Sequence, residues 1–396
     1  MKIDIITNYY PPEIGAAPNR IYNMAKGLQN IGHDVQIVSP LPNYPKGCVF
    51  AGYKGKIVVK ENEDGLNVSR YWICPSISKK PLKRAVSMFS FALSMWLSIF
   101  DVFSRKPDVV IVQNSPLFVS WSGILLYKLF SKAKIVLNVS DIWPLTALEL
   151  GVLKRGKVYS ILEKVERSNY NNSDLILGQS DEILEHVNGT IGKYDGFLYR
   201  NLTPGNPFEQ IFDQKRDSFK IVYAGLLGVA QGIYDICKHV NFKGNNIEFH
   251  IYGDGNECEE IKKLINESDL GIFYHGSIPK SELIKVLPSY QASIVPLTNR
   301  IYGAVPSKIF ESASAAVPVL FCGGGEGAKI VNEYGLGLTS EPGDSLALEK
   351  NIVSLRQMNS DEYLDIKHRC VEVSRRQFNF ERQIKQVNEV LMGLKL

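Results

Sequence analysis

A short stretch near residue 306 has residue types and spacing that suit the binding of a diphosphate. Pro306 and Ser307 favour the start of a helix, which places Lys308 in its first turn and Glu311 one turn later. Backbone N–H groups at a helix start, together with a lysine, can balance the charge of a leaving diphosphate. Glu311 offers two oxygen acceptors, which suits a ribose diol. The alternative interpretation is that Lys308 and Glu311 are ordinary surface charges.

Loops that contain glycine follow the first expected strand of each half of the chain. Gly15 and Ala16 follow the first strand, and Gly225, Gly228 and Gln231 follow the corresponding strand of the second half. At the carboxyl end of a parallel strand, such a loop lets backbone N–H groups approach a phosphate. A plain tight turn is the alternative for each loop alone, but the repetition favours two sheets that share one cleft. Neither loop has the Gly-x-Gly-x-x-Gly spacing of a dinucleotide enzyme.

Two further turns at expected strand ends are candidate ligand contacts. Gly253 follows one strand, and Ser277 and Ile278 follow His275 at the end of the next. A base or a ribose could lie flat against the backbone of such turns. For His275 we expect a strand cap rather than a catalytic role.

Short β-rich runs alternate with helical stretches along the whole chain, which predicts βαβ units and parallel sheets with helices on both faces. We therefore expect an α/β protein with two doubly wound domains. The expected strands are Lys2–Asn8, Asp34–Pro40, Asn67–Trp72, Asp108–Gln113, Lys134–Val139, Asp174–Gly178, Gly196–Tyr199, Lys220–Ala224, Ile247–Tyr252, Ile272–His275, Ala292–Val295, Val317–Phe321 and Gly337–Thr339.

The length of 396 residues favours two domains, because a single hydrophobic core stops growing at roughly 250–300 residues. Turn-forming residues gather in Asn201–Pro207, between the two sets of strands. We expect a first domain over residues 1–205 and a second over 206–375. The final stretch, Asp361–Leu396, reads as helix, and its part from about residue 376 could pack back on the first domain.

The composition is that of an ordinary globular protein, with 45% apolar and 22% charged residues. The six cysteines include no Cys-x-x-Cys pair, so neither a zinc site nor a disulfide framework is expected, and a reducing compartment fits best. The N-terminus runs directly into a strand pattern without the features of a signal peptide. A cytoplasmic location is the expectation.

The charge of the chain is uneven. Residues 1–135 contain 17 Lys and Arg against 8 Asp and Glu, whereas residues 136–396 contain 28 against 33. A basic region suggests an anionic partner, either a membrane surface or nucleic acid, and the alternative is an ordinary solvated basic face. No interleaved aromatic platform or known nucleic-acid motif accompanies it, so a membrane is the better fit.

An uncharged run of 16 residues, Ala85–Phe100, follows the basic residues Lys79, Lys80, Lys83 and Arg84. It is shorter than the roughly 20 residues that span a bilayer. A helix here places Ser87, Ser90, Ser94 and Ser98 on one weakly polar stripe and Met88, Phe91, Met95, Trp96 and Phe100 elsewhere on its surface. Such a helix suits one leaflet of an anionic membrane. A buried helix of the first domain is the alternative.

The order of these motifs resembles the retaining nucleotide-sugar glycosyltransferases of the two-Rossmann GT-B class, specifically family 4. The chain is most similar to the branch that makes bacterial surface polysaccharide such as O-antigen or capsule, which includes acetamidofucose transferases. The matching stretches are Tyr9–Arg20, Gly32–Val35, Pro107–Val110, Asp141–Pro144, Gly225–Gly232, Tyr252–Gly255, His275–Pro279, Pro306–Glu311 and Gly323–Glu326.

The resemblance implies two Rossmann-like domains that face a central cleft, with the donor bound mainly by the second and the acceptor mainly by the first. It implies a UDP-sugar donor, a polyprenyl-diphosphate-linked saccharide acceptor and a place at the inner face of the cytoplasmic membrane. No cofactor besides the donor substrate and no nucleic acid is expected. A sugar-nucleotide epimerase of the same architecture and a nucleotide-sugar-binding protein without catalysis are the alternatives.

The resemblance also assigns residues. In the Glu-x7-Glu signature of the family, Glu311 is the second glutamate, which binds ribose, and Gly303 stands in the first position. The family often has an arginine and a lysine in the loop where this chain has Leu226 and Gln231. The positive charge must then come from Lys308, with Arg300 as a second candidate. The implied donor-binding residues are Gly15, Ala16, Gly225, Gly228, Gln231, Gly253, Ser277, Ile278, Arg300, Ser307, Lys308, Glu311 and Glu326.

Asp141 and Lys308 are the candidate catalytic residues. Asp141 lies in Asp141-Ile-Trp-Pro144, where relatives carry a residue close to the reaction centre, so it could orient the acceptor hydroxyl or accept its proton. Capping of the following helix is the alternative role for this aspartate. The sequence contains no Asp-x-Asp, and no metal is expected at the site.

Overall fold

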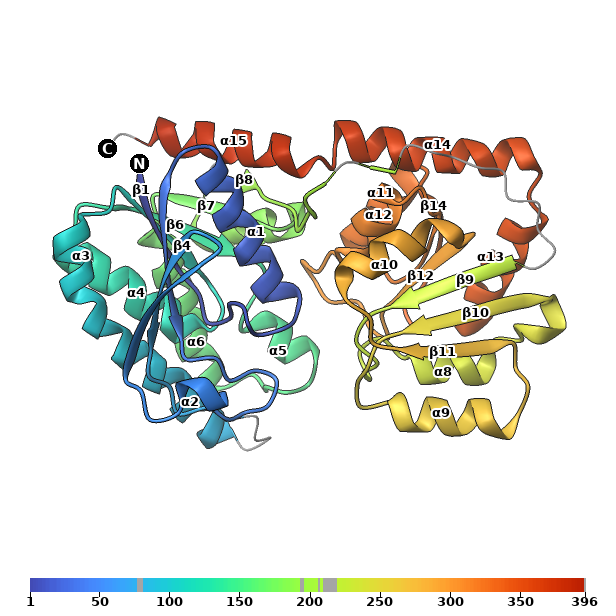
Figure 1. The fold of residues 1–396 in the computed structure, drawn as a ribbon, viewed down its shortest axis with the longest axis horizontal. Helices are drawn as coiled ribbons and strands as arrows, with labels where there is room; N and C mark the ends of the chain where they lie inside the picture. Colours follow the sequence, from blue (N-terminus) through green and yellow to red (C-terminus); the bar gives the residue numbers. More distant parts are fainter. Residues whose placement is uncertain (77–80, 193–195, 206, 209–218, 395–396) are drawn as a thin grey trace. The chain divides into compact units, whose positions relative to one another are not determined.

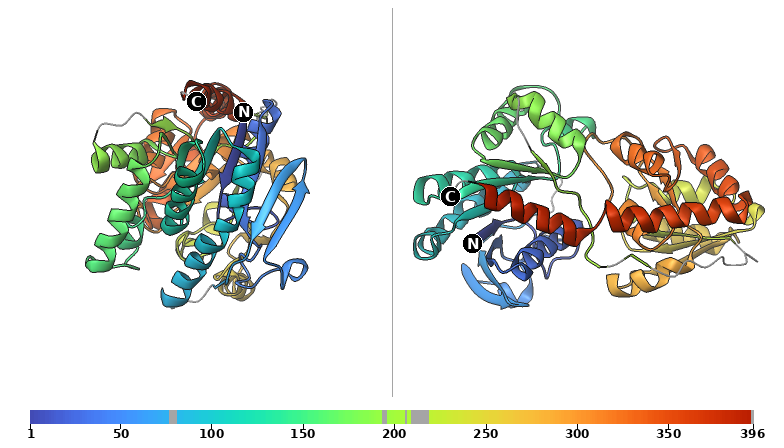
Figure 2. Two further views of the ribbon diagram at one scale, coloured as in Figure 1. Left: turned by 90° about the vertical axis from the view of Figure 1, so that its left-hand side faces the viewer. Right: turned by 90° about the horizontal axis from the view of Figure 1, so that it is seen from above.

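The structure is a computed structural model that describes residues 1–76, 81–192, 196–205, 207–208 and 219–394. The chain forms two compact units, Met1–Asn201 with Phe380–Leu396, and Leu202–Asn379 (Figure 1). The chain passes into the second unit after residue 201 and returns to the first after residue 379. The boundaries expected from the sequence were near residues 205 and 376. Both ends of the chain lie on the first unit (Figure 2).

The first unit is built on an eight-stranded sheet in the order β3-β4-β2-β1-β5-β6-β7-β8. Every neighbouring pair is parallel except β3 and β4, which form a hairpin at one edge. The strands are β1 (Lys2–Ile6), β2 (Asp34–Pro40), β3 (Val58–Glu63), β4 (Leu66–Tyr71), β5 (Val109–Gln113), β6 (Lys134–Val139), β7 (Leu175–Gly178) and β8 (Phe197–Leu198). Strand β3 was not expected, because its charged residues conceal the alternation of an exposed edge strand.

The second unit is built on a six-stranded parallel sheet in the order β11-β10-β9-β12-β13-β14. Its strands are β9 (Phe219–Ala224), β10 (Ile247–Tyr252), β11 (Ile272–Gly276), β12 (Ala292–Pro296), β13 (Val319–Cys322) and β14 (Gly337–Ser340). The prediction of two α/β domains with parallel sheets is confirmed. In each sheet the direction of strand order reverses once, between β1 and β5 and between β9 and β12. Ligands of doubly wound sheets bind beside that point, at the carboxyl ends of the strands.

Helices cover both faces of each sheet (Figures 1 and 2). Those of the first unit are α1 (Ala16–Asn30), α2 (Pro81–Ser94), α3 (Ile99–Arg105), α4 (Leu117–Phe130), α5 (Leu145–Glu149), α6 (Lys157–Asn171), α7 (Asp181–Ile191) and α15 (Phe380–Gly393), with 3-10 turns η1 (Ala51–Tyr53) and η2 (Met95–Ser98). Those of the second are α8 (Ile233–His239), α9 (Cys258–Glu267), α10 (Lys280–Val286), α11 (Lys308–Ser314), α12 (Gly325–Glu333), α13 (Ser345–Gln357) and α14 (Ser360–Arg376), with η3 (Lys243–Asn245) and η4 (Leu287–Ser289).

The last stretch of the chain is two helices, and not the single helix expected from residue 361 onward. Phe378 is buried and its ring packs against those of Phe310 and Tyr334, with centroids 4.7 and 5.3 Å away. This inward turn ends α14, and a new helix, α15, begins at Phe380. The period of the apolar residues continues through the break, which explains why the sequence does not reveal it.

The apolar run near residue 90 forms a longer helical segment than expected. The segment Val86–Arg105 has 20 residues and a mean hydropathy of 1.6, and among the described residues it alone is long and apolar enough, by length and composition, to cross a membrane. The helix continues past the charge of Asp101, which limited the uncharged run in the sequence. One third of the most apolar 18-residue stretch of this segment is buried within the unit.

The serine stripe of this segment faces inward. Ser90 and Ser98 are buried, and Oγ of Ser90 accepts a hydrogen bond from the backbone N–H of Cys74 at 2.9 Å. Phe91 and Met95, which the helical spacing places apart from the serine stripe, are also fully buried, so the inward side of the segment includes apolar side chains. Ser90 and Ser94 face the domain because they bond to the backbone of Cys74 and Trp72, in the chain that follows β4.

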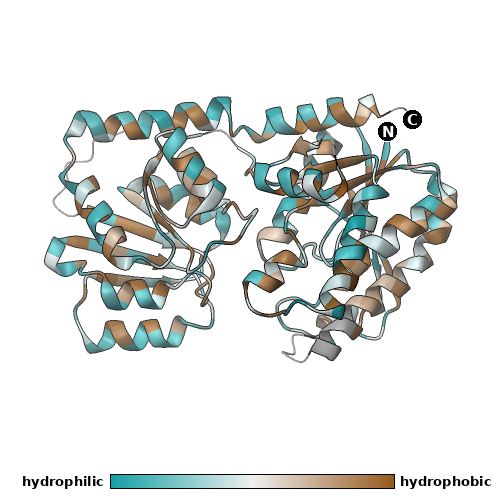
Figure 3. Cartoon of the chain, turned by 180° about the vertical axis from the view of Figure 1, so that it is seen from behind, coloured by the Kyte–Doolittle hydropathy of each residue, from teal (hydrophilic) through white to brown (hydrophobic). Residues whose placement is uncertain are grey.

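The opposite side of the segment, together with α4, carries large apolar side chains in contact with solvent, which we call the apolar stripe. Rings of the two elements are in contact, with a centroid distance of 4.7 Å between Phe89 and Phe118. Figure 3 shows the apolar colouring of these helices. Lys83 is exposed in the first turn of α2, whereas Lys79 and Lys80 lie outside the described residues. The stripe consists of Val86, Phe89, Leu93, Leu97, Phe100, Phe103, Trp121 and Leu129, which are 42–74% exposed.

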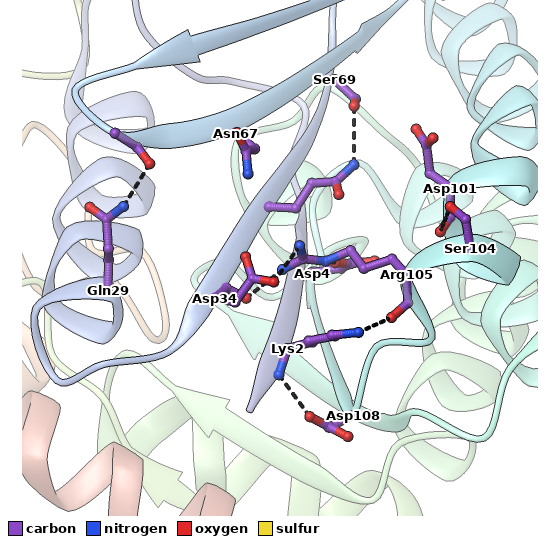
Figure 4. A network of polar contacts seen from close by, with 12 residues as sticks. Lys2, Asp4, Gln29, Asp34, Asn67, Ser69, Asp101, Ser104, Arg105 and Asp108 are labelled. Atoms are coloured by element: carbon purple, nitrogen blue, oxygen red, sulfur yellow. Dashed lines mark hydrogen bonds and ion pairs between the residues drawn. The ribbon is translucent and has the colours of Figure 1, made fainter.

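Arg105, the last residue of α3, anchors this segment to the first sheet (Figure 4). Its guanidinium donates to Asp4 of β1 and to Asp34 of β2, each at 2.8 Å. The second oxygen of Asp4 accepts from the hydroxyl of Tyr127 in α4 at 2.6 Å. Burial raises the pKa of Asp4, although Tyr127 and Arg105 favour its ionised form. One buried carboxylate thus holds α3 and α4 to the same strand.

In the second unit, the loops after β9 and β10 lie against each other along their backbones. Gly225 donates to the carbonyl of Tyr252 at 2.8 Å, and Leu227 donates to that of Asp254 at 3.0 Å. A Cβ on Gly253 would lie 1.8 Å from the carbonyl oxygen of Gly225, and the φ of Gly253 is +148°. Only glycine fits at this position, because both the space and the backbone conformation exclude a side chain.

Replacing Gly253 by alanine is expected to lower the free energy of unfolding by roughly 2–4 kcal/mol, because overlap and backbone strain add. Gly276→Ala is the matched control: φ there is +73°, but nothing lies within 4 Å of the added Cβ. The control should cost only the strain, about 1–2 kcal/mol. Thermal unfolding of the full chain measures both, and a melting temperature that falls equally in the two variants would contradict the close approach.

Candidate active site

The candidate site of the second unit is built around Lys308, the first residue of α11. Ser307 is the residue at the helix N-cap. The lysine side chain runs back to the loop after β9, where a Cβ on Gly225 would lie 2.6 Å from its Nζ. The same Nζ lies 5.5 Å from the centre of the Tyr223 ring. Lys308 therefore lies beside the point where the strand order of the sheet reverses.

The ammonium of Lys308 is largely shielded from water. Burial lowers its pKa, and the carboxylate of Glu311 only partly offsets this effect. Lys308 forms no hydrogen bond or ion pair with any residue that the structure describes; its one close aromatic contact is with Tyr223. A half-buried charge without a partner costs free energy, so the site is suited to an anion.

Glu311 lies one turn further along α11 and contacts two residues that the sequence did not indicate. Its Oε1 accepts from Nζ of Lys280 at 2.9 Å and from the hydroxyl of Thr203 at 3.3 Å. Lys280 begins α10, after the turn that contains Ser277 and Ile278. No motif joins these three residues in the sequence, and only the fold brings them together.

Gln231 has an unsatisfied polar atom at the first loop. Its buried Oε1 has no hydrogen-bond partner in the described part of the chain, and a Cβ on Gly228 would lie 3.2 Å from that oxygen. Buried acceptors are normally paired, so this oxygen is suited to a ligand hydroxyl or N–H.

The remaining expected residues of the second unit follow neighbouring strands. Gly253 donates to the carbonyl of Gly276 at 2.9 Å, which holds the turns after β10 and β11 together, and Ser277 is exposed there. His275 is not a cap but lies inside β11, stacked on Tyr252 with ring centres 4.5 Å apart.

Arg300 and Glu326 lie on the other side of the reversal point. The Cδ of Arg300 is 3.4 Å from the position of a Cβ on Gly324, directly before α12. Glu326 is buried in the first turn of that helix. The structure thus brings the expected donor-binding residues of this unit to the carboxyl edge of one sheet.

In the first unit, Gly15 is the N-cap of α1 and Ala16 is its first residue. Arg20 in the next turn was not among the expected site residues. It is buried, and its guanidinium donates to the amide oxygens of Gln113, at 3.2 Å, and Gln179. Burial lowers the pKa of Arg20 to about 10.

Asp141 follows β6 and is half-buried. Its Oδ1 accepts from the hydroxyl of Thr146 in α5 at 2.5 Å. Burial raises the pKa of Asp141, and hydrogen bonds from Thr146 and the backbone of Ile142 reduce that effect. These contacts belong to the start of the next helix, yet a raised pKa also suits a proton acceptor. The N-cap of α5 is Pro144, without a side-chain cap, so Asp141 does not cap this helix and contacts its first turn through Thr146.

Within the residues that the structure describes, no group of three or more His, Cys, Asp or Glu side chains could hold a metal ion. All six cysteines are free thiols.

Comparisons with known families agree with this arrangement. Residues 15–192 match the glycosyl transferase 4-like domain, and residues 218–358 match the glycosyl transferases group 1. The chain belongs to the GT-B glycosyltransferases. The family expected from the sequence is confirmed, and the two matched domains correspond to the two sheets.

Individual proteins support the same family. WcaI of Escherichia coli strain K12, described as a glycosyl transferase of colanic acid biosynthesis, is 25% identical over 68% of this chain and 70% of its own length. WbjE of Pseudomonas aeruginosa, described as a glycosyltransferase, is 27% identical over 72% of this chain and 78% of its own. The structure of Anabaena HepE in complex with UDP shares the fold, with a TM-score of 0.71, 12% identity and full coverage of both chains.

Replacing Lys308 by methionine is expected to weaken the binding of inorganic pyrophosphate at least about tenfold, because a hydrogen bond to a charged group is lost. In the parent protein, affinity should fall as the pH rises through the lowered pKa of Lys308, since only the ammonium attracts the anion. Lys308→Arg should move this loss to higher pH. Calorimetric titration measures both effects.

Lys350→Met, an exposed lysine of α13, is the matched control and should leave pyrophosphate binding unchanged. Equal weakening in both variants would mean that the effect is one of net charge and that Lys308 is not the anion contact.

Proposed function

We propose that this glycosyltransferase moves a hexosyl unit from a nucleotide diphosphate sugar, specifically a UDP-sugar, to a saccharide linked to polyprenyl diphosphate. The product belongs to bacterial surface polysaccharide such as O-antigen or capsule. The proposed reaction retains the anomeric configuration and needs neither a metal ion nor a further cofactor. The proposed place of action is the cytoplasmic face of the cell membrane.

The observation that carries this proposal is the unpaired ammonium of Lys308 beside Gly225. A nucleotide diphosphate develops negative charge on its leaving phosphate as the sugar bond breaks, and a preorganised cation stabilises that charge. Glu311 lies one helical turn further along α11, and its carboxylate offers acceptors to a ribose. UDP is supported further by HepE, which shares the fold and binds that nucleotide.

Asp141 is the proposed partner of the acceptor hydroxyl. In a front-face displacement, the hydroxyl oxygen attacks the anomeric carbon on the side that the diphosphate leaves, and the departing phosphate can accept the proton. Asp141 then orients the hydroxyl and need not be a strong base. WcaI, described in colanic acid biosynthesis, supports a polysaccharide as the product.

Membrane contact is proposed through the apolar stripe of the first unit. The side chains of the stripe remain 42–74% exposed within the described chain, and isolated soluble proteins rarely expose so many neighbouring large apolar side chains. Because Phe91, Met95 and Ser98 face the domain and Arg105 is bound to Asp4, the segment can lie in one leaflet but is not surrounded by lipid as a spanning helix is. The basic excess of the first 135 residues favours anionic headgroups.

The function is tested by incubating the purified chain with UDP-sugars and membrane extracts that contain lipid-linked saccharides. Radiolabelled sugar should move to the lipid fraction. A protein that binds UDP but neither hydrolyses any donor nor transfers sugar would be a binding protein without catalysis. Conversion of the free donor in the absence of acceptor would instead indicate an epimerase.

Asp141→Asn is expected to lower the turnover number by about 10²–10⁴ while keeping the affinity for UDP, because the amide cannot take the role of the carboxylate. The rate of the parent enzyme should fall as the pH drops through the raised pKa of Asp141, since its ionised form is the active one. Asparagine still offers an acceptor oxygen to Thr146. An Asp141→Asn variant with full turnover would therefore limit this residue to its contact at the helix start.

Replacing Leu93 and Phe100 by glutamate is expected to reduce sedimentation with phosphatidylglycerol vesicles at least about tenfold, since each buried side chain contributes roughly 1.5–3 kcal/mol. Leu346→Glu is the matched control, because that leucine is 72% exposed but belongs to the second unit. A parent protein that stays in solution with these vesicles at low salt would exclude the proposed membrane contact.

A further inference from the structure

The carboxylate of Glu311 is engaged through only one of its two oxygens. Its contacts from Lys280, at 2.9 Å, and from Thr203, at 3.3 Å, are both made to Oε1. Lys280 also donates to the Thr203 hydroxyl at 3.2 Å, so the three groups form a closed triangle. Within the described chain, Oε2 of Glu311 has no such contact.

The triangle leaves one acceptor and one donor available side by side. An ammonium has three N–H donors, and Lys280 uses two of them, for Glu311 and for Thr203. The free oxygen Oε2 is an acceptor on the adjacent carboxylate. A pair of this kind matches a cis diol, in which one hydroxyl can donate while its neighbour accepts.

We propose that Lys280 is a second contact of the ribose diol, beside Glu311, to which the family resemblance already assigns the ribose. One hydroxyl donates to Oε2 of Glu311, and the other accepts the third N–H of Lys280. This inference rests on the proposed function, because it takes a ribonucleotide as the ligand. It assigns a ligand-binding role to a lysine outside the Glu-x7-Glu signature.

The surroundings of the pair support recognition rather than a simple surface ion pair. The Glu311 side chain is 23% exposed and that of Lys280 is 39% exposed, so both are accessible yet partly desolvated. An exposed ion pair alone contributes little to stability. Here Thr203 restricts the pair, and the lysine begins a helix directly after the turn at Ser277.

The experiment measures calorimetric affinities for UDP, 2′-deoxy-UDP and 3′-deoxy-UDP. The parent chain should bind UDP about tenfold more tightly than at least one deoxy analogue, as expected for a lost hydrogen bond to a charged group. Lys280→Met should bind UDP about tenfold more weakly, with its preference for UDP over that analogue largely lost. Lys280→Gln, which keeps an N–H donor, should retain part of the preference.

Lys285→Met is the matched control, since Lys285 is exposed in the last turn of the same helix, and it should keep the full preference. If Lys280→Met weakens UDP and both analogues equally, Lys280 acts on the diphosphate or on folding, and the inference is wrong. If the parent chain binds no UDP, the proposed function fails first. If it binds UDP without any preference for the diol, only the present inference fails.

Discussion

The candidate site depends on one constraint of parallel sheets: all strands of a sheet end at the same edge. A strand covered on both faces is largely apolar, as β5 and β12 are, so most of the polar side chains of the site come from the loops that follow the strands. The residues after β9, β10, β11, β12 and β13 are therefore collected at one edge although they are spread over more than 90 positions of the sequence. The same constraint collects Gly15, Arg20 and Asp141 in the first unit. Neither set could form on the faces of the sheets, which helices cover.

The position of the Lys308 side chain depends on Gly225, although the two residues are distant in the sequence. The loop after β9 contains no arginine or lysine, and the positive charge comes from the start of α11 instead. The lysine can reach this loop only because residue 225 has no side chain, since a Cβ there would overlap its Nζ and Cε. The positive charge at this site can therefore come from α11 instead of the loop after β9, provided that the loop leaves space for the lysine side chain.

How far the sequence predicts this molecule depends on the range of the interactions involved. Buried strands such as β6 and β10 were predicted at their observed bounds, because a run of apolar residues between turns is a local signal. Lys308 became a candidate through an equally local signal, the helix start that Pro306 and Ser307 indicate, and it is the first residue of α11. The edge strand β3, the break before Phe380 and the inward direction of the serine stripe were not. Each of these depends on contacts that the local sequence does not record.

Lys280 shows the same limit at the site itself. A lysine in the first turn of an exposed helix is common, and nothing in its neighbourhood distinguishes it from Lys285. Its significance comes from the fold, which places its Nζ 2.9 Å from a carboxylate oxygen 31 residues later in the chain. The sequence does not distinguish such a lysine until the position of its partner, Glu311, is known. The local pattern therefore predicted the charged groups of the helix α11, but not the group that restricts one of them.

The exposed side chains of the apolar stripe do not stabilise the first unit by themselves. Exposed large side chains gain nothing from folding while they remain in water, and a helix that presents them must be held in place by its other side. Ser90 and the contacts from Arg105 and Tyr127 to Asp4 do this with hydrogen bonds and an ion pair rather than with apolar packing alone. The helices are thereby fixed independently of the stripe, which leaves the apolar side chains available to a second surface. A stripe that was needed for the core could not serve both purposes.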